Sequence, residues 1–372
     1  MKHFLQLTFV FFACFFITCN KDATETNITD TPSDNNTMYF PPINTNTWET
    51  IDVNTLNWKE ENLDALYTHL EENDTKAFII LKDGKIAIEK YFGLNASGNE
   101  FDEESYWYWA SAGKTIISLA IGIAQQNGDL NINDKTATYL GTGWTSLSED
   151  KEDLITIKHQ LSMTTGLNYD VEDANCTTPT CLNYNTDAGN EWYYYNAPYL
   201  LLREVINNAT NSNYKTYIQE HIEDKIGMTS PFWFGSDIEA IYWSNARDMA
   251  RFGLLILNEG IWEDSEVLTD KNYFEEMTTT SQNLNEAYGY LWWLNGKNNI
   301  IYPSTTTKLS LELASNAPDD LIAAIGKNGQ FIDVIPSENI VIIRMGEAPN
   351  EALVPVEFHN EMWSLINTVV NQ

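Results

Sequence analysis

"WASAGKTIISLAIGIAQQNG" (residues 109–128) is the stretch that most clearly indicates both a fold and a chemistry. Ser111 and Lys114 stand three residues apart at the beginning of a run with helical periodicity. Side chains three apart share one face of a helix, so the Lys114 amino group can reach the Ser111 hydroxyl group. Asn127 and Gly128 are typical of a helix end. Apolar residues surround most of this helix and predict that it is buried: Ile116, Ile117, Leu119, Ala120, Ile123 and Ala124.

A lysine in such surroundings loses hydration, which lowers its pKa and allows it to act as a base. A serine at a helix N-terminus also has its main-chain N–H group where a developing oxyanion needs a donor. The alternative is a helix that begins with a small residue and carries one solvated lysine. The Ser-x-x-Lys motif alone does not distinguish these two interpretations. Ser148 and Lys151 repeat it within the acidic "SLSEDKED", where we expect a solvated loop.

Two later segments contain the polar groups that would complete a site. "EWYYYNAPYLLL" contains Tyr194-x-Asn196, and "IGKNGQFIDVIP" contains Lys327-x-Gly329 at the start of a strand pattern. The alternatives are aromatic packing for Tyr194, a turn or helix cap for Asn196 and a solvated strand end for Lys327. Tyr193 and Tyr195 are expected to take part in packing or to form a pocket wall. In a further segment, "YGYLWWL", Trp292 and Trp293 are expected to belong to the core rather than to form a platform for the substrate.

The order of the predicted elements indicates an α+β fold. Strand-like runs lie near both chain ends, including a hairpin at Asp83-Gly84, and helical patterns fill the middle. The economical arrangement is one antiparallel sheet built from both ends (residues 45–115 and 285–372), with flanking helices and a mainly helical part (116–284) beside it. A site is then expected in the groove between the two parts. Helices are expected at residues 60–72, 155–165, 197–208, 213–226, 246–259 and 357–370.

The three motifs in this order resemble those of the serine beta-lactamase and penicillin-binding-protein superfamily. The Tyr-x-Asn form is similar to the class C beta-lactamase and esterase branch, and "AYGYLWWL" resembles 6-aminohexanoate-dimer hydrolases and related carboxylesterases. The likeness extends over residues 45–370. The chain departs from the pattern at Lys327, where many esterases have His, at Asn328, where beta-lactamases have Thr, and at Gln330, where beta-lactamases have a small residue.

The resemblance implies a mechanism. Ser111 is the nucleophile, Lys114 with Tyr194 is the base, and the main-chain amides of Ser111 and Gln330 form the oxyanion hole. Asn196 orients the substrate, while Lys327 either keeps Tyr194 acidic or binds a substrate carboxylate beside Gly329. No metal and no organic cofactor is required. We therefore interpret the sequence as that of a serine hydrolase of small esters or amides. One alternative is a beta-lactamase or D-Ala-D-Ala carboxypeptidase, and another is a catalytically silent binding or sensor protein.

The N-terminus predicts export. Residues 1–19 have a positive start at Lys2, an apolar run and a final Cys19, which resembles a bacterial lipoprotein signal; the alternative is an ordinary secretory signal. A disordered polar linker is expected over residues 20–44. Outside the cytoplasm, Cys176 and Cys181 in "NCTTPTC" are expected to form a disulfide, and no histidine stands at metal-ligand spacing from them.

Composition excludes some partners. The 372-residue chain is 43% apolar and carries a formal net charge of −32, from 53 acidic and 21 basic residues. Such a field repels nucleic acid and anionic membranes. Any membrane association is therefore expected only through a lipid anchor at Cys19, and the acidity itself is expected to serve solubility.

Overall fold

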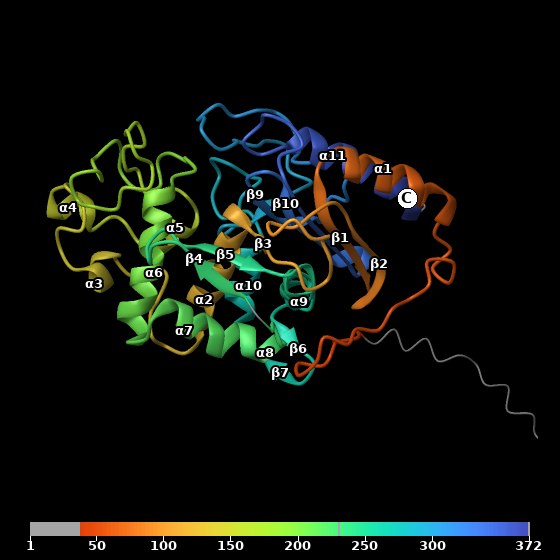
Figure 1. Cartoon of the computed structure of the whole chain (residues 1–372). Coiled ribbons are helices and arrows are strands. Elements are labelled where there is room, and N and C mark those ends of the chain that lie inside the picture. Colours follow the sequence, from red (N-terminus) through yellow and green to blue (C-terminus); the bar gives the residue numbers. More distant parts are fainter. Residues whose placement is uncertain (1–37, 230, 371–372) are drawn as a thin grey trace, which may run out of the picture. The chain divides into compact units, whose positions relative to one another are not determined.

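The computed structural model describes residues 38–229 and 231–370. A six-stranded antiparallel sheet with strand order β2-β1-β11-β10-β9-β8 dominates this part of the chain (Figure 1). The two chain ends meet where β1 pairs with β11, with Phe78 opposite Arg344. The strands are β1 (Thr75–Lys82), β2 (Lys85–Tyr91), β8 (Trp293–Leu294), β9 (Ile322–Gly326), β10 (Gln330–Ile335) and β11 (Ile340–Gly346). The predicted α+β arrangement with a sheet from both ends is confirmed.

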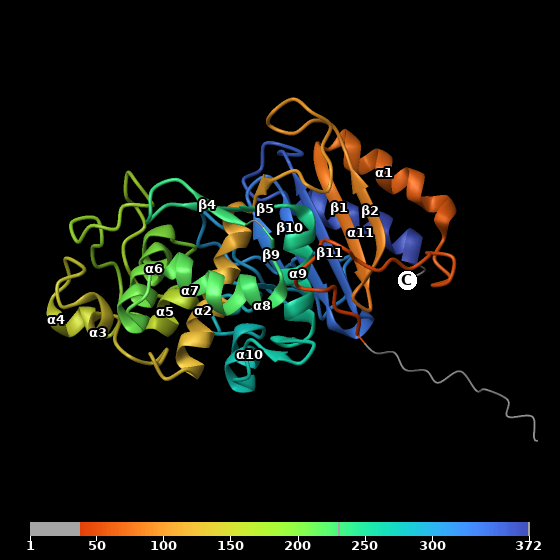
Figure 2. The same ribbon diagram turned by 60° about the horizontal axis from the view of Figure 1, so that its bottom comes forward.

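The central strands are buried along their whole length because helices cover both faces of the sheet. α1 (Leu63–Glu72) and α11 (Val356–Val370) lie side by side on one face, as both views show (Figures 1 and 2). α9 (Ala246–Leu257) packs on the other face against β10 and β11. A Cβ atom at Gly253 would lie 2.5 Å from the Val341 side chain, so the glycine allows α9 to approach the sheet closely.

The predicted hairpin turn between β1 and β2 is also confirmed. Asp83 and Gly84 have φ angles of 50° and 82°, the left-handed pair that a two-residue hairpin turn requires. A Cβ atom at Gly84 would lie 1.9 Å from the Tyr39 carbonyl oxygen, so this position also needs glycine for space.

The middle of the chain is mainly helical. The predicted helix at 213–226 is one continuous segment, in which the π-helical turn η3 (Gln219–Glu223) joins α7 (Tyr214–Ile218) to α8 (Asp224–Ile226). The remaining helices are α2 (Lys114–Gln126), α3 (Ala137–Leu140), α4 (Glu149–Glu152), α5 (Ile157–Leu161), α6 (Asn196–Thr210) and α10 (Lys271–Met277). α2 runs between this helical part and the sheet (Figure 2).

Three short strands form a second sheet that the sequence did not reveal. β3 (Trp107–Tyr108), β5 (Ile241–Ser244) and β4 (Phe232–Phe234) pair in the order β3-β5-β4. A third pair, β6 (Ile261–Trp262) with β7 (Ser265–Glu266), follows α9. The region 116–284 therefore contains strands as well as helices.

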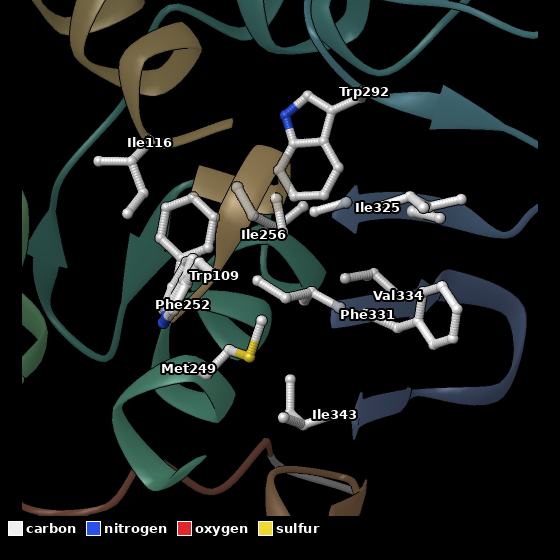
Figure 3. Packing of buried hydrophobic residues seen from close by; sticks show 14 of the residues in the cluster. Trp109, Ile116, Met249, Phe252, Ile256, Trp292, Ile325, Phe331, Val334 and Ile343 are labelled. Atoms are coloured by element: carbon white, nitrogen blue, oxygen red, sulfur yellow. The ribbon is translucent and has the colours of Figure 1, made fainter. Parts of the chain in front are cut away.

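Aromatic and aliphatic side chains fill the space between α2, α9 and the large sheet. Figure 3 shows Trp109, Phe252 and Trp292 meeting Ile325 and Phe331 there. The rings of Phe252 and Trp292 stack with centroids 6.2 Å apart. Trp292 is thus a core residue, as expected.

The predicted linker is too long at its C-terminal end. Residues 38–44 belong to the folded unit: the Tyr39 amide donates to the Asp83 carbonyl, and Arg251 donates to the carbonyls of Pro41 and Pro42. Phe40 packs edge-on against Trp262. The aromatic pair Tyr39-Phe40 explains the difference, because burying these rings ties the segment down. The predicted signal, with Cys19, and the linker up to residue 37 lie outside the described residues.

Candidate active site

A strained turn presents Ser111. Trp109 is anchored because its indole N–H donates to Ser244 Oγ (2.8 Å) and its main-chain N–H donates to the Tyr242 carbonyl (2.8 Å). Ala110 then adopts a φ angle of 47°, which is unusual for a residue other than glycine and is typical of functional sites. Ser111 lies in the 3-10 turn η2 (Ala110–Gly113), so the α-helix begins at Lys114 rather than at Ser111.

Lys114 contacts Ser111 directly. Its Nζ atom donates a hydrogen bond to Ser111 Oγ over 3.1 Å, and the side chain is 5% exposed. The amino group lies 4.4 Å from the ring centroid of Tyr199 and 5.1 Å from that of Tyr194. Burial, and then the positive charge of Arg203, lower the pKa of Lys114 to about 7. Among the described residues no carboxylate forms a salt bridge with Lys114, so its neutral form is well populated at pH 7.

Tyr194 completes a triad with these two residues. Its hydroxyl group is hydrogen-bonded to Ser111, and its ring stacks on Trp293 with centroids 6.0 Å apart. Burial raises the pKa of Tyr194 above its ordinary value, and the hydrogen bond with Ser111 offsets only part of this. Lys327 is not among the groups that shift the pKa of Tyr194, so this geometry gives no support to the alternative in which Lys327 keeps Tyr194 acidic. The phenol stays protonated at neutral pH and can pass on a proton but cannot serve as a standing base.

Asn196 is the first residue of α6 and is held by the cysteine loop. Its Nδ2 group donates to Asn175 Oδ1 (3.0 Å), while its own Oδ1 atom is buried without a partner. Asn175 precedes the expected disulfide, which joins Cys176 to Cys181. The loop therefore fixes the Asn196 amide and leaves its oxygen free to accept a hydrogen bond in the site.

Lys327 and Gly329 lie in the turn between β9 and β10. Gly329 has a φ angle of 76°, and a Cβ atom there would lie 2.7 Å from Arg344 Nη1, so its role is to form the turn. Asn328 donates from Nδ2 to the Tyr108 hydroxyl (2.8 Å). Arg344, fully buried on β11, donates to the carbonyls of Asn328 (2.7 Å) and Gly329 (2.9 Å).

The prediction for Gln330 fits the structure poorly. Gln330 is fully buried, and its side-chain amide exchanges hydrogen bonds with the main chain of Gly346. It lines neither pocket beside Ser111, because the chain has already re-entered the sheet at this residue. Gly326 is the residue that touches the serine turn: a Cβ atom there would lie 2.4 Å from the Trp109 carbonyl oxygen. Lys327 directly follows it.

Two pockets flank the nucleophile, in the groove between the helical part and the sheet. The first, of about 420 Å³, is called the polar pocket because it contains Lys114, Arg203, Glu239 and Asn175. The second, of about 230 Å³, is called the apolar pocket because Tyr193, Trp293, Pro303, Ile325, Leu353 and Val354 line it. Ser111, Asn196 and Lys327 belong to both. Trp293 is thus a pocket wall as well as a packed residue.

Arg203 is a site residue that the sequence reasoning missed. It lies on α6, seven residues after Asn196 and hence on the same helix face. Its guanidinium group is buried, donates to the carbonyls of Ile238 (2.6 Å) and Ala240 (2.9 Å) and to the Tyr199 hydroxyl (3.3 Å), and has an Nε atom without a partner. The available signal was an arginine directly after the apolar run "YLLL", at the start of "REVI".

The second Ser-x-x-Lys sequence is remote from this site. Ser148 is exposed, Lys151 pairs with Asp187 (2.7 Å), and neither residue lines either pocket. Within residues 38–229 and 231–370, no three His, Cys, Asp or Glu side chains are grouped to hold a metal ion. The helices of this part include none with the length and apolar character needed to cross a membrane.

The two-part α+β fold with Ser111, Lys114 and Tyr194 together in its groove is that of the serine beta-lactamase and penicillin-binding-protein superfamily. The family model described as Beta-lactamase matches residues 63–352, and the chain belongs to this family.

Solved structures and a curated relative show the same likeness. "Putative 6-aminohexanoate-dimer hydrolase from Bacillus anthracis" is similar with a TM-score of 0.66 at 17% identity, over 88% of this chain and 89% of that one. The octameric penicillin-binding protein homologue from Pyrococcus abyssi has a TM-score of 0.61 at 17% identity, over 82% and 76%. An uncharacterized protein of Alkalihalophilus pseudofirmus is 20% identical over 296 residues, which are 71% of this chain and 81% of the relative. At these identities the likeness shows the fold.

Proposed function

We propose that this protein is an exported serine hydrolase that cleaves small esters or amides through an acyl-enzyme on Ser111. The observation that carries the proposal is the 3.1 Å hydrogen bond between Lys114 Nζ and Ser111 Oγ in a buried setting that favours the neutral amine. A neutral amine within hydrogen-bond reach of a hydroxyl group is a competent general base.

In the proposed mechanism, Ser111 Oγ attacks the substrate carbonyl carbon while Lys114 takes the hydroxyl proton. The tetrahedral intermediate collapses as the Tyr194 phenol gives its proton to the leaving alcohol or amine, and Lys114 restores that proton to Tyr194. A water molecule then attacks the acyl-enzyme, gives a proton to Lys114, and releases the acid as Ser111 regains its proton. Each group ends the cycle in its starting state, so the scheme needs no cofactor.

The oxyanion would bind to main-chain donors. We assign the amide of Ser111 and, in place of Gln330, the amide of Lys327. Lys327 lines both pockets, and no hydrogen bond from its amide to another group occurs in the described part of the chain. Gly326 brings this segment against the serine turn. Two converging N–H groups are the usual means of stabilising such an intermediate.

One observation favours a second candidate, a beta-lactamase or D-Ala-D-Ala carboxypeptidase. Lys327 lies beside the nucleophile at the junction of the two pockets, where an ammonium group could bind the carboxylate that both of those substrates carry. The chemistry at Ser111 would be the same, and only the acyl donor would differ.

The proposed export rests on residues 1–19, and the disulfide agrees with it, since disulfides persist in oxidising compartments. The catalytic proposal is tested by treating the purified protein with a fluorophosphonate and mapping the adduct by mass spectrometry. We expect labelling at Ser111 that is lost in Ser111→Ala, weak in Lys114→Ala and unchanged in the matched control Ser148→Ala. Labelling at Ser111 would then justify assaying untreated protein against a panel of esters, amides and beta-lactams. A folded protein without an adduct would instead indicate the silent binding protein.

A further inference from the structure

The apolar pocket has a composition that the catalytic mechanism does not require. Eight of the twelve described residues that line it are apolar or aromatic, and Lys327, at the junction with the polar pocket, is the only charged residue among the twelve. The walls come from separate parts of the fold: Tyr193 precedes α6, Trp293 is on β8, Ile325 is on β9, and Leu353 and Val354 precede α11. Convergence of apolar side chains on one space beside a nucleophile is what a site for an uncharged group needs.

Leu353 gives a second indication. It is 49% exposed although it is a large apolar side chain at the edge of this pocket. On a surface with a net charge of −32, an apolar rim beside a cavity is a candidate contact for a ligand.

The polar pocket on the other side of Ser111 differs sharply. It contains the cations Arg203 and Lys327, the amino group of Lys114 and the carboxylate of Glu239. The two halves of a substrate whose scissile bond lies at Ser111 would therefore meet different surroundings, one apolar and one polar.

We propose that the apolar pocket binds an uncharged alkyl or aryl group on one side of the scissile bond, a specificity that rests on the hydrolase function proposed above. The volume of about 230 Å³ exceeds the roughly 150 Å³ apolar cavity that accommodates benzene, so a phenyl ring with a short linker fits. Both the acyl half and the alcohol half of an ester could supply this group.

The experiment measures kcat/KM for two ester series. In one, the acyl group grows from acetyl through butyryl and hexanoyl to phenylacetyl on a fixed phenol; in the other, acetate esters carry alcohols of increasing size. Each buried methylene group contributes about 0.8 kcal/mol, so kcat/KM should rise about three- to fourfold per methylene in one series until the pocket is full. The series that shows the rise identifies the half of the substrate that occupies the pocket.

Charge supplies a second readout. A hemisuccinate ester is similar in length to the butyryl ester but ends in a carboxylate. We expect its kcat/KM to be at least tenfold lower, because burying a charge is costly among side chains that are mostly apolar and include a cation, Lys327, only at the junction with the polar pocket. Equal or better turnover of the charged ester would overturn the proposal.

Variants connect the preference to the pocket. Leu353→Asp should reduce the hexanoyl-to-acetyl ratio of kcat/KM at least tenfold. The matched control Leu311→Asp, at a leucine that is 54% exposed and lines neither pocket, should leave the ratio unchanged. If Ser111 is labelled by a small fluorophosphonate but both series are flat, the proposal is wrong and the hydrolase function stands; if Ser111 is not labelled, the hydrolase function itself fails.

Discussion

Lys114 is the residue whose charge state controls the proposed chemistry. Its amino group is surrounded by Ser111, the rings of Tyr194 and Tyr199, and the cation Arg203, with Lys327 at the same pocket. Because burial and Arg203 both disfavour the charged form, the pKa of Lys114 falls to about 7. The neutral amine is the reactive form, so we expect kcat/KM to rise with pH through a limb near 7.

Arg203→Gln tests how much of this depends on the second cation. Removing the positive charge stabilises protonated Lys114, so the acidic limb should move to higher pH, and kcat/KM should fall below the limb while recovering above it. Each pKa unit of movement corresponds to about a tenfold loss on the acidic side. The measurement is the pH profile of kcat/KM from pH 5 to 9.5.

Arg203→Lys is the matched control, because it keeps the charge while losing the planar set of hydrogen bonds to the 238–240 carbonyls. The acidic limb of its kcat/KM profile should stay near the pH at which the parent protein has it. If both variants lose activity equally at every pH, Arg203 only supports the pocket wall and does not tune Lys114.

At the scale of single residues, motif spacing in the sequence predicted the reacting groups but not the residues that surround them. Ser111, Lys114, Tyr194, Asn196 and Lys327 do converge in the structure. Arg203 was missed because the loop that covers it lies about 35 residues away in sequence. The prediction for Gln330 fits poorly because spacing along the chain does not reveal that the turn ends before this residue.

Among the elements, the turn between β9 and β10 depends on a neighbouring strand. Arg344 on β11 donates to the carbonyls of Asn328 and Gly329, and to those of Asn73 and Glu347. This buried guanidinium group, whose Nε atom also donates to Thr75 Oγ1 (3.1 Å), fixes the backbone on which Lys327 is carried.

Arg344→Met should reduce the free energy of unfolding by roughly 2–4 kcal/mol, because it leaves buried carbonyl oxygens without donors. We also expect kcat/KM to fall more than tenfold as Lys327 loses its fixed position. Urea unfolding and steady-state kinetics measure the two effects. Arg247→Met is the control: Arg247 forms a partly exposed ion pair with Glu89 and lines neither pocket, so its loss should cost less stability and little activity. Full activity in folded Arg344→Met would contradict this account.

The cysteine loop makes a separate prediction. Without the disulfide, Asn175 is held less firmly and its bond to Asn196 Nδ2 weakens. A hydrogen bond of this kind is worth about 1 kcal/mol, so the double variant Cys176→Ser, Cys181→Ser should lose about fivefold in kcat/KM. A reductant should cause the same loss in the parent protein and none in the double variant; a loss in both would point to a different target of the reductant.

Long elements were predictable and short ones were not. The apolar periodicity of α2, α6 and α9 and the Asp83-Gly84 turn are local signals, and each produced the expected element. β3 has two residues and pairs with β5, with Trp107 opposite Ser244, about 137 positions later in the chain. No local sequence pattern therefore predicts this strand. The start of α2 at Lys114 was missed for a similar reason, because β9 packs against the preceding turn and holds it in a 3-10 geometry.

At the scale of the whole molecule, the position of strands at both chain ends predicted the large sheet correctly. Strands near the two ends need partners, and the simplest way to bury them is to pair those of one end with those of the other. Attachment to a membrane is a different matter, since Cys19 lies outside the described residues.

Lipidation at Cys19 can be tested with the full chain produced in a bacterial host. We expect the parent protein in the detergent phase of a phase-separation assay, with an added lipid mass on the peptide that begins at Cys19, and Cys19→Ser in the aqueous phase. Cys14→Ser, within the same signal, should behave like the parent protein. A parent protein that is exported, cleaved and free of lipid would indicate an ordinary secretory signal.

The net charge of −32 has a consequence for stability that salt should reveal. With 53 acidic and 21 basic residues, most carboxylates lack a cationic partner, and their mutual repulsion opposes the compact state. Raising NaCl from about 10 mM to 1 M shortens the screening length from about 30 Å to about 3 Å, so the melting temperature should rise, by roughly 2–5 °C. Comparison with sodium sulfate at low, equal ionic strength separates the causes, because screening predicts equal gains whereas exclusion of sulfate from the protein surface predicts a larger gain in sulfate. A melting temperature that stays flat or falls in NaCl would show that the acidic side chains are spaced widely enough for repulsion to be small, and that their role is solubility alone.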